Sequence, residues 1–183
     1  MGSKKTSNHK LSAEVEAKFL TSYEEYADAV FRHVMLRVRD REVAKDIVQE
    51  TFSRTWLYLS KRKEVEHMRA FLYRVANNLI VDTMRKKRSV SLDAMMEEDG
   101  FEPVDPNVEE PKDTLATQEA MKLLGSLDEI YRTAITMRYI DELSPKEIAH
   151  VLGVSENVVS VRIHRGIERL SKLVQRDPLK TQS

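Results

Sequence analysis

Apolar side chains recur every three or four residues through the first part of the chain. From Phe19 onward the recurring positions are Tyr23, Tyr26, Val30, Phe31, Val34 and Val38. This spacing places them on one side of an α-helix, and that side needs neighbouring helices to cover it. Residues 1–10 carry three lysines and no apolar face, so we expect a disordered tail there.

A second helix is predicted directly after Asp40, which stands where an N-cap residue would stand. Its inward positions are Val43, Ile47, Thr51 and Leu59, flanked by Ala44, Val48, Phe52 and Trp56. The opposite face carries Asp46, Gln49 and Glu50 at i, i+3 and i+4, so an acid, an amide and an acid project together. On spacing alone these three side chains are a solvated face. Trp56 is either a second contact beside this face or part of the core, and as a lone tryptophan we expect it in the core.

A third helical pattern follows the polar loop 61–67. Its apolar positions are Met68, Phe71, Leu72, Val75, Ala76 and Leu79. The pattern ends in four consecutive basic residues, 85–88. A cationic cluster at a helix end neutralises phosphates whatever the base sequence, although it also complements the helix dipole.

Residues 89–113 interrupt the helical pattern. They hold three prolines, one glycine, nine acidic residues and one basic residue. A segment of this composition can form neither a hydrophobic core nor a long helix. Such a segment of 25 residues spans about 80 Å at full extension. We therefore predict a flexible acidic linker between two domains.

A helix-turn-helix is predicted in the last third of the chain, after further helical patterning at residues 116–139. Ser144 stands at an N-cap, Pro145 at the first helical position, and Glu147 completes a capping box. Gly153 ends this helix and Ser155 caps the next. The second helix of such a motif enters the major groove of DNA.

These patterns predict an all-α protein of two small helical domains. The predicted divisions are a tail at 1–10, a domain at 11–88, the linker at 89–113, a domain at 114–176 and a tail at 177–183. The formal net charge of zero hides a segregation, because residues 1–88 hold 19 basic and 12 acidic side chains while the linker is strongly acidic. Such separated poles favour different partners or different surfaces of one partner.

The sequence offers little chemistry for catalysis. It has no cysteine, which excludes disulfides, thiolate zinc sites and cysteine nucleophiles. It has no Gly-rich phosphate loop, no nucleophile elbow and no histidines at metal-ligand spacing, so we expect no catalytic residue, no metal and no cofactor. No apolar run approaches the length of about 18 residues that a membrane span needs. We expect a cytoplasmic protein without membrane insertion.

The stretches DIVQETFSRTW and FLYRVANNLIVDTMRKKR resemble the second conserved region of bacterial RNA polymerase sigma factors, in the extracytoplasmic-function (ECF) group. With the helix-turn-helix, which resembles the fourth region, the resemblance runs from about Phe19 to Val174. It implies that Asp46, Gln49 and Glu50 face the clamp helices of the polymerase's largest subunit, and that the polymerase flap is a further contact. A carboxylate pair with an amide between can meet basic side chains there and steer association.

The resemblance also implies that the first domain reads and melts the −10 promoter element. In the family the loop at residues 61–67 cups a flipped base, and the helix after it lies along the DNA. The candidate −10 residues are Tyr73, Arg74, Asn77, Asn78, Asp82, Arg85, Lys86, Lys87 and Arg88. An amide suits adenine and a carboxylate accepts from the amino group of cytosine. Tyr73 and Phe71 could stack on an unpaired base, although core packing is the simpler interpretation for Phe71.

The fourth-region resemblance implies that the second domain reads the −35 element. Candidate contacts are Asn157, Ser160, Arg162, His164, Arg165 and Arg169. Relatives usually carry Gly-Thr-Val at 157–159, a basic residue at Ser160 and a small polar one at Val161. These differences from the family pattern do not change the expected fold, but they leave open which bases the helix contacts.

Three function classes are compatible with these observations. The first is a sigma factor that docks on core RNA polymerase, recognises a bipartite promoter as duplex and as single strand, and helps open it. The second is a free-standing helix-turn-helix regulator, which would leave the acid-amide face without a role. The third is a DNA-processing enzyme such as a recombinase, whose nucleophile cluster is missing. The linker is either plain and solvated or, by resemblance, threads the RNA-exit path. An anti-sigma factor held between the two domains is a possible partner.

Overall fold

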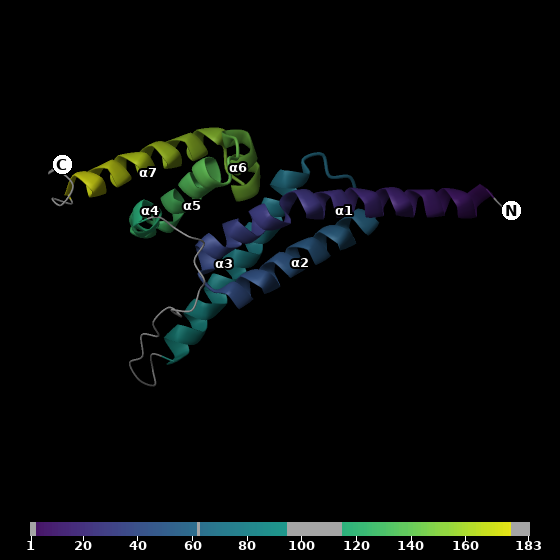
Figure 1. Ribbon diagram of the computed structural model, residues 1–183, viewed down its shortest axis with the longest axis horizontal. Coiled ribbons are helices and arrows are strands. Elements are labelled where there is room, and N and C mark those ends of the chain that lie inside the picture. The colour runs from purple at the N-terminus through teal and green to yellow at the C-terminus, as the bar shows by residue number, and fades with distance from the viewer. Residues whose placement is uncertain (1–2, 62, 95–114, 177–183) are drawn as a thin grey trace. The chain divides into compact units, whose positions relative to one another are not determined.

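The computed structural model describes residues 3–61, 63–94 and 115–176, with side chains from Ala13 to Lys87 apart from position 62, and from Ala120 to Gln175. Every regular element in these ranges is helical (Figure 1). The helices are α1 (Ser3–Val38), α2 (Arg41–Ser60), α3 (Met68–Ala94), α4 (Leu115–Gly125), α5 (Glu129–Ile135), the π-helix η1 (Thr136–Ile140), α6 (Pro145–Leu152) and α7 (Glu156–Arg176). The predicted all-α fold is confirmed.

The chain divides into two compact units, Met1–Pro106 and Asn107–Ser183. The division falls within the predicted linker 89–113, most of which lies outside the described residues. The boundaries of that linker therefore stay a prediction.

Three long helices form the first unit. α1, α2 and α3 each pack against the other two (Figure 1). The core between them is built from apolar side chains with at most 5% exposure, among them Val30, Val34, Ile47, Phe52, Leu59, Leu72, Ala76 and Ile80. Thr51 and Thr55 are buried with them and donate their hydroxyl protons to backbone carbonyls one turn earlier, at 2.7 and 2.8 Å, so no hydroxyl proton is left unpaired. The predicted inward stripes are confirmed for Val30 and Val34 of α1 and for Ile47, Thr51 and Leu59 of α2, whereas Tyr23 of the α1 stripe is exposed.

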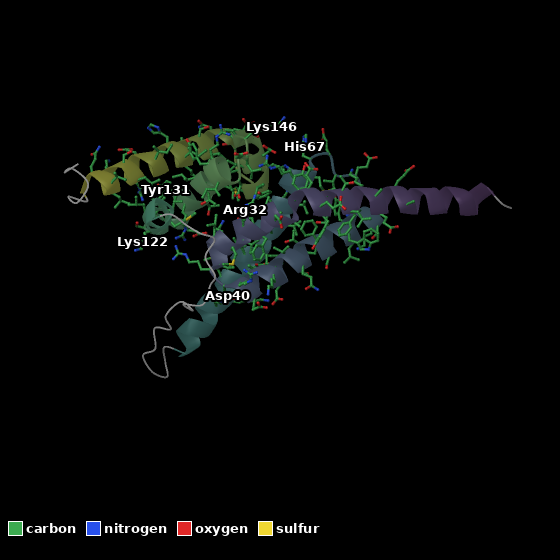
Figure 2. The ribbon with its side chains drawn as sticks, viewed as in Figure 1. Arg32, Asp40, His67, Lys122, Tyr131 and Lys146 are labelled. Atoms are coloured by element: carbon green, nitrogen blue, oxygen red, sulfur yellow. The ribbon has the colours of Figure 1, made fainter. Side chains whose placement is uncertain are left out.

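The junction between α1 and α2 is fixed by Asp40 (Figure 2). Arg39 adopts a left-handed backbone with φ of 53°, which ends α1 tightly, and its N–H donates to the carbonyl of Met35 at 2.9 Å. Asp40 Oδ1 then accepts from the backbone N–H of Val43 at 3.0 Å. This satisfies one of the orphan donors at the start of α2, so Asp40 is the N-cap that the sequence predicted.

Two helices are longer than the sequence patterns indicated. α1 begins at Ser3, whereas a disordered tail was expected at residues 1–10, and that prediction is wrong for residues 3–10. α3 continues to Ala94, so the basic residues 85–88 do not end their helix. Neither extension contains glycine or proline, the two residues that most oppose a helix. Polarity alone was therefore a poor guide to where these helices stop.

The second unit is built from α4 to α7. Leu127, Tyr131 and Ile135 form its buried cluster, and Leu124, Leu170 and Leu173 pack against that cluster. Gly166 lets α7 approach α5 closely, because a Cβ at this position would lie 2.5 Å from Cδ1 of Ile135. The α5–α7 contact thus fixes which face of α7 is turned inward.

The helix-turn-helix has the geometry that its cap residues predicted. Ser144 Oγ accepts from the backbone N–H of Glu147 at 3.2 Å, and the Glu147 carboxylate accepts from the backbone N–H of Ser144 at 2.8 Å. Gly153 is left-handed, with φ of 66°, and closes α6. Ser155 Oγ accepts from the N–H of Val158 at 3.3 Å at the start of α7. Each half of the motif is therefore started or stopped by a local interaction.

Candidate functional site

The acid-amide patch, defined here as Asp46, Gln49 and Glu50, lies on the outer face of α2. All three side chains are exposed, while Ile47 and Thr51 between and beside them are buried. Glu50 accepts from Nε of Arg54 at 2.7 Å, an exposed ion pair within the helix. Such a pair contributes little to stability and exchanges readily for another cation. The patch is therefore available to a basic partner.

An open apolar groove, which we call the α1–α2 groove, borders this patch. It has a volume of about 840 Å³ and includes Gln49 in its lining. Its apolar and aromatic lining residues are Phe19, Leu20, Tyr23, Ala27, Phe31, Val48, Phe52 and Trp56. Because Gln49 belongs to both, the groove and the acid-amide patch form one continuous surface with an apolar part and an acidic part.

Trp56 belongs to this groove and not to the core. Its side chain is 36% exposed and meets the ring of Phe19 edge-on, with 5.2 Å between ring centroids. Leu20 and Tyr23 on α1 are about half exposed beside it. The expectation of a buried tryptophan was wrong, because a large ring on the flank of α2 reaches α1 with one edge only. The spacing of seven residues between Gln49 and Trp56, two helical turns, was the available signal in the sequence.

A polar and basic face runs along α3. Arg74, Asn78, Asp82 and Arg85 are exposed at intervals of four, four and three residues, which aligns them on one side of the helix. Arg85 donates to Asp82 at 3.1 Å. Lys86 and Lys87 are exposed close by, and Lys87 Nζ lies 3.6 Å from Oδ2 of Asp40. The side chain of Arg88 lies outside the described residues.

Two of the proposed −10 residues lie in the core instead. Tyr73 is 1% exposed and meets His33 edge-on at 5.0 Å between ring centroids, so its ring has no free face for a base. Asn77 is 8% exposed, and its Oδ1 accepts from Nη1 of Arg37 at 3.5 Å. Both positions follow the inward stripe of Leu72, Ala76 and Ile80. The structure thus corrects their assignment, and of the two adjacent asparagines only Asn78 faces outward.

An aromatic and cationic cluster lies where α2 ends and α3 begins. The rings of Tyr58 and Phe71 are 4.8 Å apart, and Nζ of Lys63 lies 5.1 Å from the centroid of Tyr58. The intervening loop is anchored by the buried Val65, whose carbonyl accepts from Nζ of Lys18 at 3.2 Å. His67 precedes α3 (Figure 2). Sequence reasoning did not single out Tyr58 or Lys63, because only the fold brings them to Phe71.

The outer face of α7 begins at its first turn. Asn157, Ser160, His164 and Arg165 are exposed, as predicted for side chains that meet DNA, while Val159 and Gly166 are buried on the opposite side. Arg162 is half-buried on the flank of the helix. The exposed residues occupy the first three turns of α7, the part of a recognition helix that reaches base edges.

Arg169 differs from the other predicted −35 residues. Its guanidinium lies over the ring of Tyr131, 4.3 Å from the centroid, and forms an ion pair with Asp128. Both partners belong to the segment that packs against α7. Arg169 therefore fastens α7 to α5 while it stays exposed, and its contact with DNA stays a prediction.

Most of the chain matches known protein families and individual relatives. The family "Sigma-70 region 2" matches residues 22–90, and the family "Sigma-70, region 4" matches residues 117–170. The ECF RNA polymerase sigma factor SigW of Bacillus subtilis (strain 168) is 31% identical over 160 residues, covering 80% of this chain and 83% of SigW. The chain belongs to the ECF sigma factors.

Further comparisons agree with this family. SigM of the same strain is 28% identical over 156 residues, covering 84% of this chain and 93% of SigM. The fold of the sigma factor also resembles that of RpoE from Bartonella quintana, solved in complex with the anti-sigma factor NepR. The TM-score is 0.70 at 21% identity, over 87% of this chain and 98% of RpoE. The sequence-based recognition of an ECF sigma factor is confirmed, and the protein is a polymerase-associated transcription initiation factor.

The two sigma regions coincide with the surfaces described above. Region 2 contains the acid-amide patch, most of the α1–α2 groove and the outer face of α3, and region 4 contains the helix-turn-helix. Within the described side chains there is no group of three or more histidine, aspartate or glutamate residues arranged to hold a metal ion. In the same described parts, no helix combines the length and apolar character needed to cross a membrane.

Proposed function

We propose that this sigma factor binds core RNA polymerase through the acid-amide patch and the adjoining α1–α2 groove, and reads promoter DNA through α3 and α7. It would do so in the cytoplasm, where the polymerase acts. The observation that carries the proposal is the separation of surfaces on the first unit. An acidic patch with an apolar neighbour lies on the outer face of α2, while α3 carries its own run of exposed basic residues, Arg74, Arg85, Lys86 and Lys87.

The docking surface combines two kinds of interaction. Asp46 and Glu50 attract a basic partner helix over a long range and speed the encounter. Buried apolar contacts in the groove then supply affinity, with Trp56 as the large ring that interfaces use most often as an anchor. Because Gln49 lies in both parts, a single partner helix could meet the acids and the groove together. The clamp helices of the polymerase's largest subunit are the partner that the family suggests.

The −10 element would be read by α3 and the cluster before it. Asn78 offers an amide to adenine, and Asp82 offers a carboxylate that Arg85 already engages. Phe71, half-buried beside Tyr58, offers the aromatic face for an unpaired base that the buried Tyr73 cannot offer. The exposed cations Arg74, Lys86 and Lys87 would neutralise phosphates.

The −35 element would be read by α7. Asn157, Ser160, His164 and Arg165 form the outward face of its first turns. Residues 89–113 would connect the two readers, and their path past the polymerase stays a prediction because most of them lie outside the described residues. The flap would hold the second unit in place.

Regulation by an inhibitor is the natural extension of this proposal. RpoE of Bartonella quintana was solved with an anti-sigma factor, NepR. A protein of that kind would silence this chain by covering the acid-amide patch or the groove. The free-standing regulator, the alternative considered from the sequence, would need neither surface.

Run-off transcription tests the proposal. Purified core polymerase would be mixed with the full chain and a library of promoter sequences, and transcripts would be sequenced. We expect transcripts from templates that share two conserved elements, seen only when the chain is present. Duplex binding without core polymerase, and no transcript from any template, would favour the free-standing regulator.

A further inference from the structure

Two valines stand out on the outward face of α7. Asn157, Ser160, Val161, His164 and Arg165 follow one another at i, i+3, i+4, i+7 and i+8, and all are exposed. Val161 sits at the centre of this stripe with 40% of its side chain exposed. Val158, one turn earlier and adjacent on the surface, is 37% exposed. The face of the helix that meets DNA therefore carries methyl groups at its centre.

These valines do not serve the core of the second unit. Val159 is fully buried, and Gly166 meets Ile135 and Tyr131 of α5. The inner side of α7 is thus already occupied by other residues. Single exposed apolar side chains are common, but a pair at the centre of a stripe of DNA-reading side chains is informative about its ligand.

The polar side chains beside Val161 limit which groups of DNA this face of α7 can contact. Ser160 donates its hydroxyl proton to the carbonyl of Glu156 at 3.0 Å, within its own helix. Its hydrogen-bond donor is therefore engaged, and Ser160 presents mainly an acceptor. Arg162 lies beside Val161, and Arg165 lies one turn beyond it. Both carry the positive charge that binds phosphates. The middle of the stripe is apolar, and cationic side chains lie beside it and one turn beyond it.

We propose that Val161, supported by Val158, is a specificity-determining residue that reads the C5-methyl group of thymine in the upstream promoter element. The inference rests on the proposed −35 role of α7 and names one base that this role would select. Thymine is the base that shows a methyl group in the major groove, and apolar side chains contact it there. The first turns of a recognition helix are the ones that reach base edges. The neighbouring arginines Arg162 and Arg165 fit a nucleic acid better than an apolar protein partner.

A uracil scan tests the proposal directly. Holoenzyme would be formed from core polymerase and the full chain, and a promoter would be taken from the run-off library. Each thymine of the upstream element would be replaced singly by deoxyuridine, which lacks only the C5-methyl group. Affinity for each duplex would be measured by fluorescence anisotropy. We expect a loss of about fourfold at one or two positions, from the burial of a single methyl group.

Substitutions then link that loss to the valine. In Val161→Ala holoenzyme, the same deoxyuridine replacements should change affinity by less than about 1.5-fold, because the methyl group has lost its partner. Val174→Ala is the matched control. Val174 is also an exposed valine on α7, 13 residues later and so about 20 Å further along the axis. Its substitution should leave the pattern of the scan unchanged.

Each remaining outcome overturns the inference. If no deoxyuridine weakens binding while the wild-type holoenzyme still selects its promoter, the proposed −35 role of α7 is retained and the proposed contact of Val161 with thymine is rejected. The same holds if Val161→Ala keeps the full uracil penalty. If Val161→Ala weakens binding to core polymerase with no change in the scan, the valines belong to a protein interface. If the wild-type holoenzyme selects no promoter, the proposed function itself falls with the inference.

Discussion

The guanidinium of Arg169 on α7 lies 4.3 Å from the ring centroid of Tyr131 on α5 and is also paired with Asp128. The resemblance to the fourth sigma region had grouped Arg169 with Arg165 as a contact to DNA. The two arginines are one turn apart on α7 and both are exposed, yet only Arg169 contacts Tyr131 and Asp128. Their substitution should therefore have different consequences.

Arg169→Ala should lower the free energy of unfolding and leave promoter binding within about twofold of the wild type. The loss of an exposed cation–π contact costs about 0.5–1 kcal/mol. Arg165→Ala should leave unfolding unchanged, weaken promoter binding, and reduce the salt dependence of binding by about one phosphate contact. Urea unfolding and a salt titration of duplex affinity separate the two effects. A larger loss of DNA affinity in Arg169→Ala than in Arg165→Ala would reverse the assignment.

Asp40→Ala should destabilise the first unit by about 1 kcal/mol at neutral pH, because α2 loses its N-cap. The hydrogen bond from the N–H of Val43 is the main cause that lowers the pKa of Asp40 below its ordinary value; burial opposes this shift, and the charge of Lys87 lowers the pKa further. A carboxyl group whose pKa is lower in the folded state than in the unfolded state stabilises the protein when the pH is above the unfolded pKa. This contribution to stability is lost as the pH falls from the unfolded pKa through the folded pKa.

The matched control for that cap is Asp40→Asn, which keeps an acceptor for Val43 and removes the charge. Urea unfolding of the three proteins between pH 7 and pH 3 would measure the effect. We expect stability to fall more steeply with acid in the wild type than in either variant. Parallel pH profiles in all three would mean that the Asp40 carboxylate contributes no pH dependence.

Trp56→Ala should weaken binding to core polymerase by about tenfold, the effect of losing an interface anchor of at least moderate strength. Leu57→Ala is the matched control, since Leu57 is exposed on the same helix and does not line the α1–α2 groove. Its substitution should leave binding near the wild-type value. Anisotropy of the labelled chain with core polymerase provides the measurement. Equal affinities of both variants would exclude the groove from the interface.

Phe71→Ala should reduce the formation of open complexes by about tenfold, within the range expected for one aromatic–base stack. Phe71→Tyr keeps an aromatic face and should retain opening. The fluorescence of 2-aminopurine placed in the −10 element reports base unstacking. Normal opening by a folded Phe71→Ala protein would remove Phe71 from the base site.

Features governed by local contacts were predicted well from the sequence. The cap at Asp40, the capping box of Ser144 and Glu147 and the left-handed Gly153 each depend on residues within one helical turn. Helix caps of this kind can be predicted from the sequence without knowing the rest of the fold. The acid-amide patch was also placed on an exposed face, because the stripe opposite it was apolar.

Besides the extents of α1 and α3, the errors concerned how each helix is rotated against its neighbours. Asn77 and Asn78 differ by one residue, about 100° around α3, and packing against Arg37 decides that Asn77 is buried. Tyr73 is held inward by its contact with His33 on another helix. Such contacts join residues about 40 positions apart in the chain. Spacing within one helix cannot supply them.

The central claim is that the outer face of α2 docks on core polymerase. It is tested most directly by titrating labelled chain with purified core polymerase, comparing the wild type, Glu50→Lys and the control Glu25→Lys, an exposed glutamate of α1 outside the lining of the groove. We predict tight binding by the wild type and the control. Glu50→Lys should bind at least about tenfold more weakly, since like charges oppose each other across the interface, with unfolding nearly unchanged. Equal binding by all three proteins, or none by the wild type, would contradict the claim.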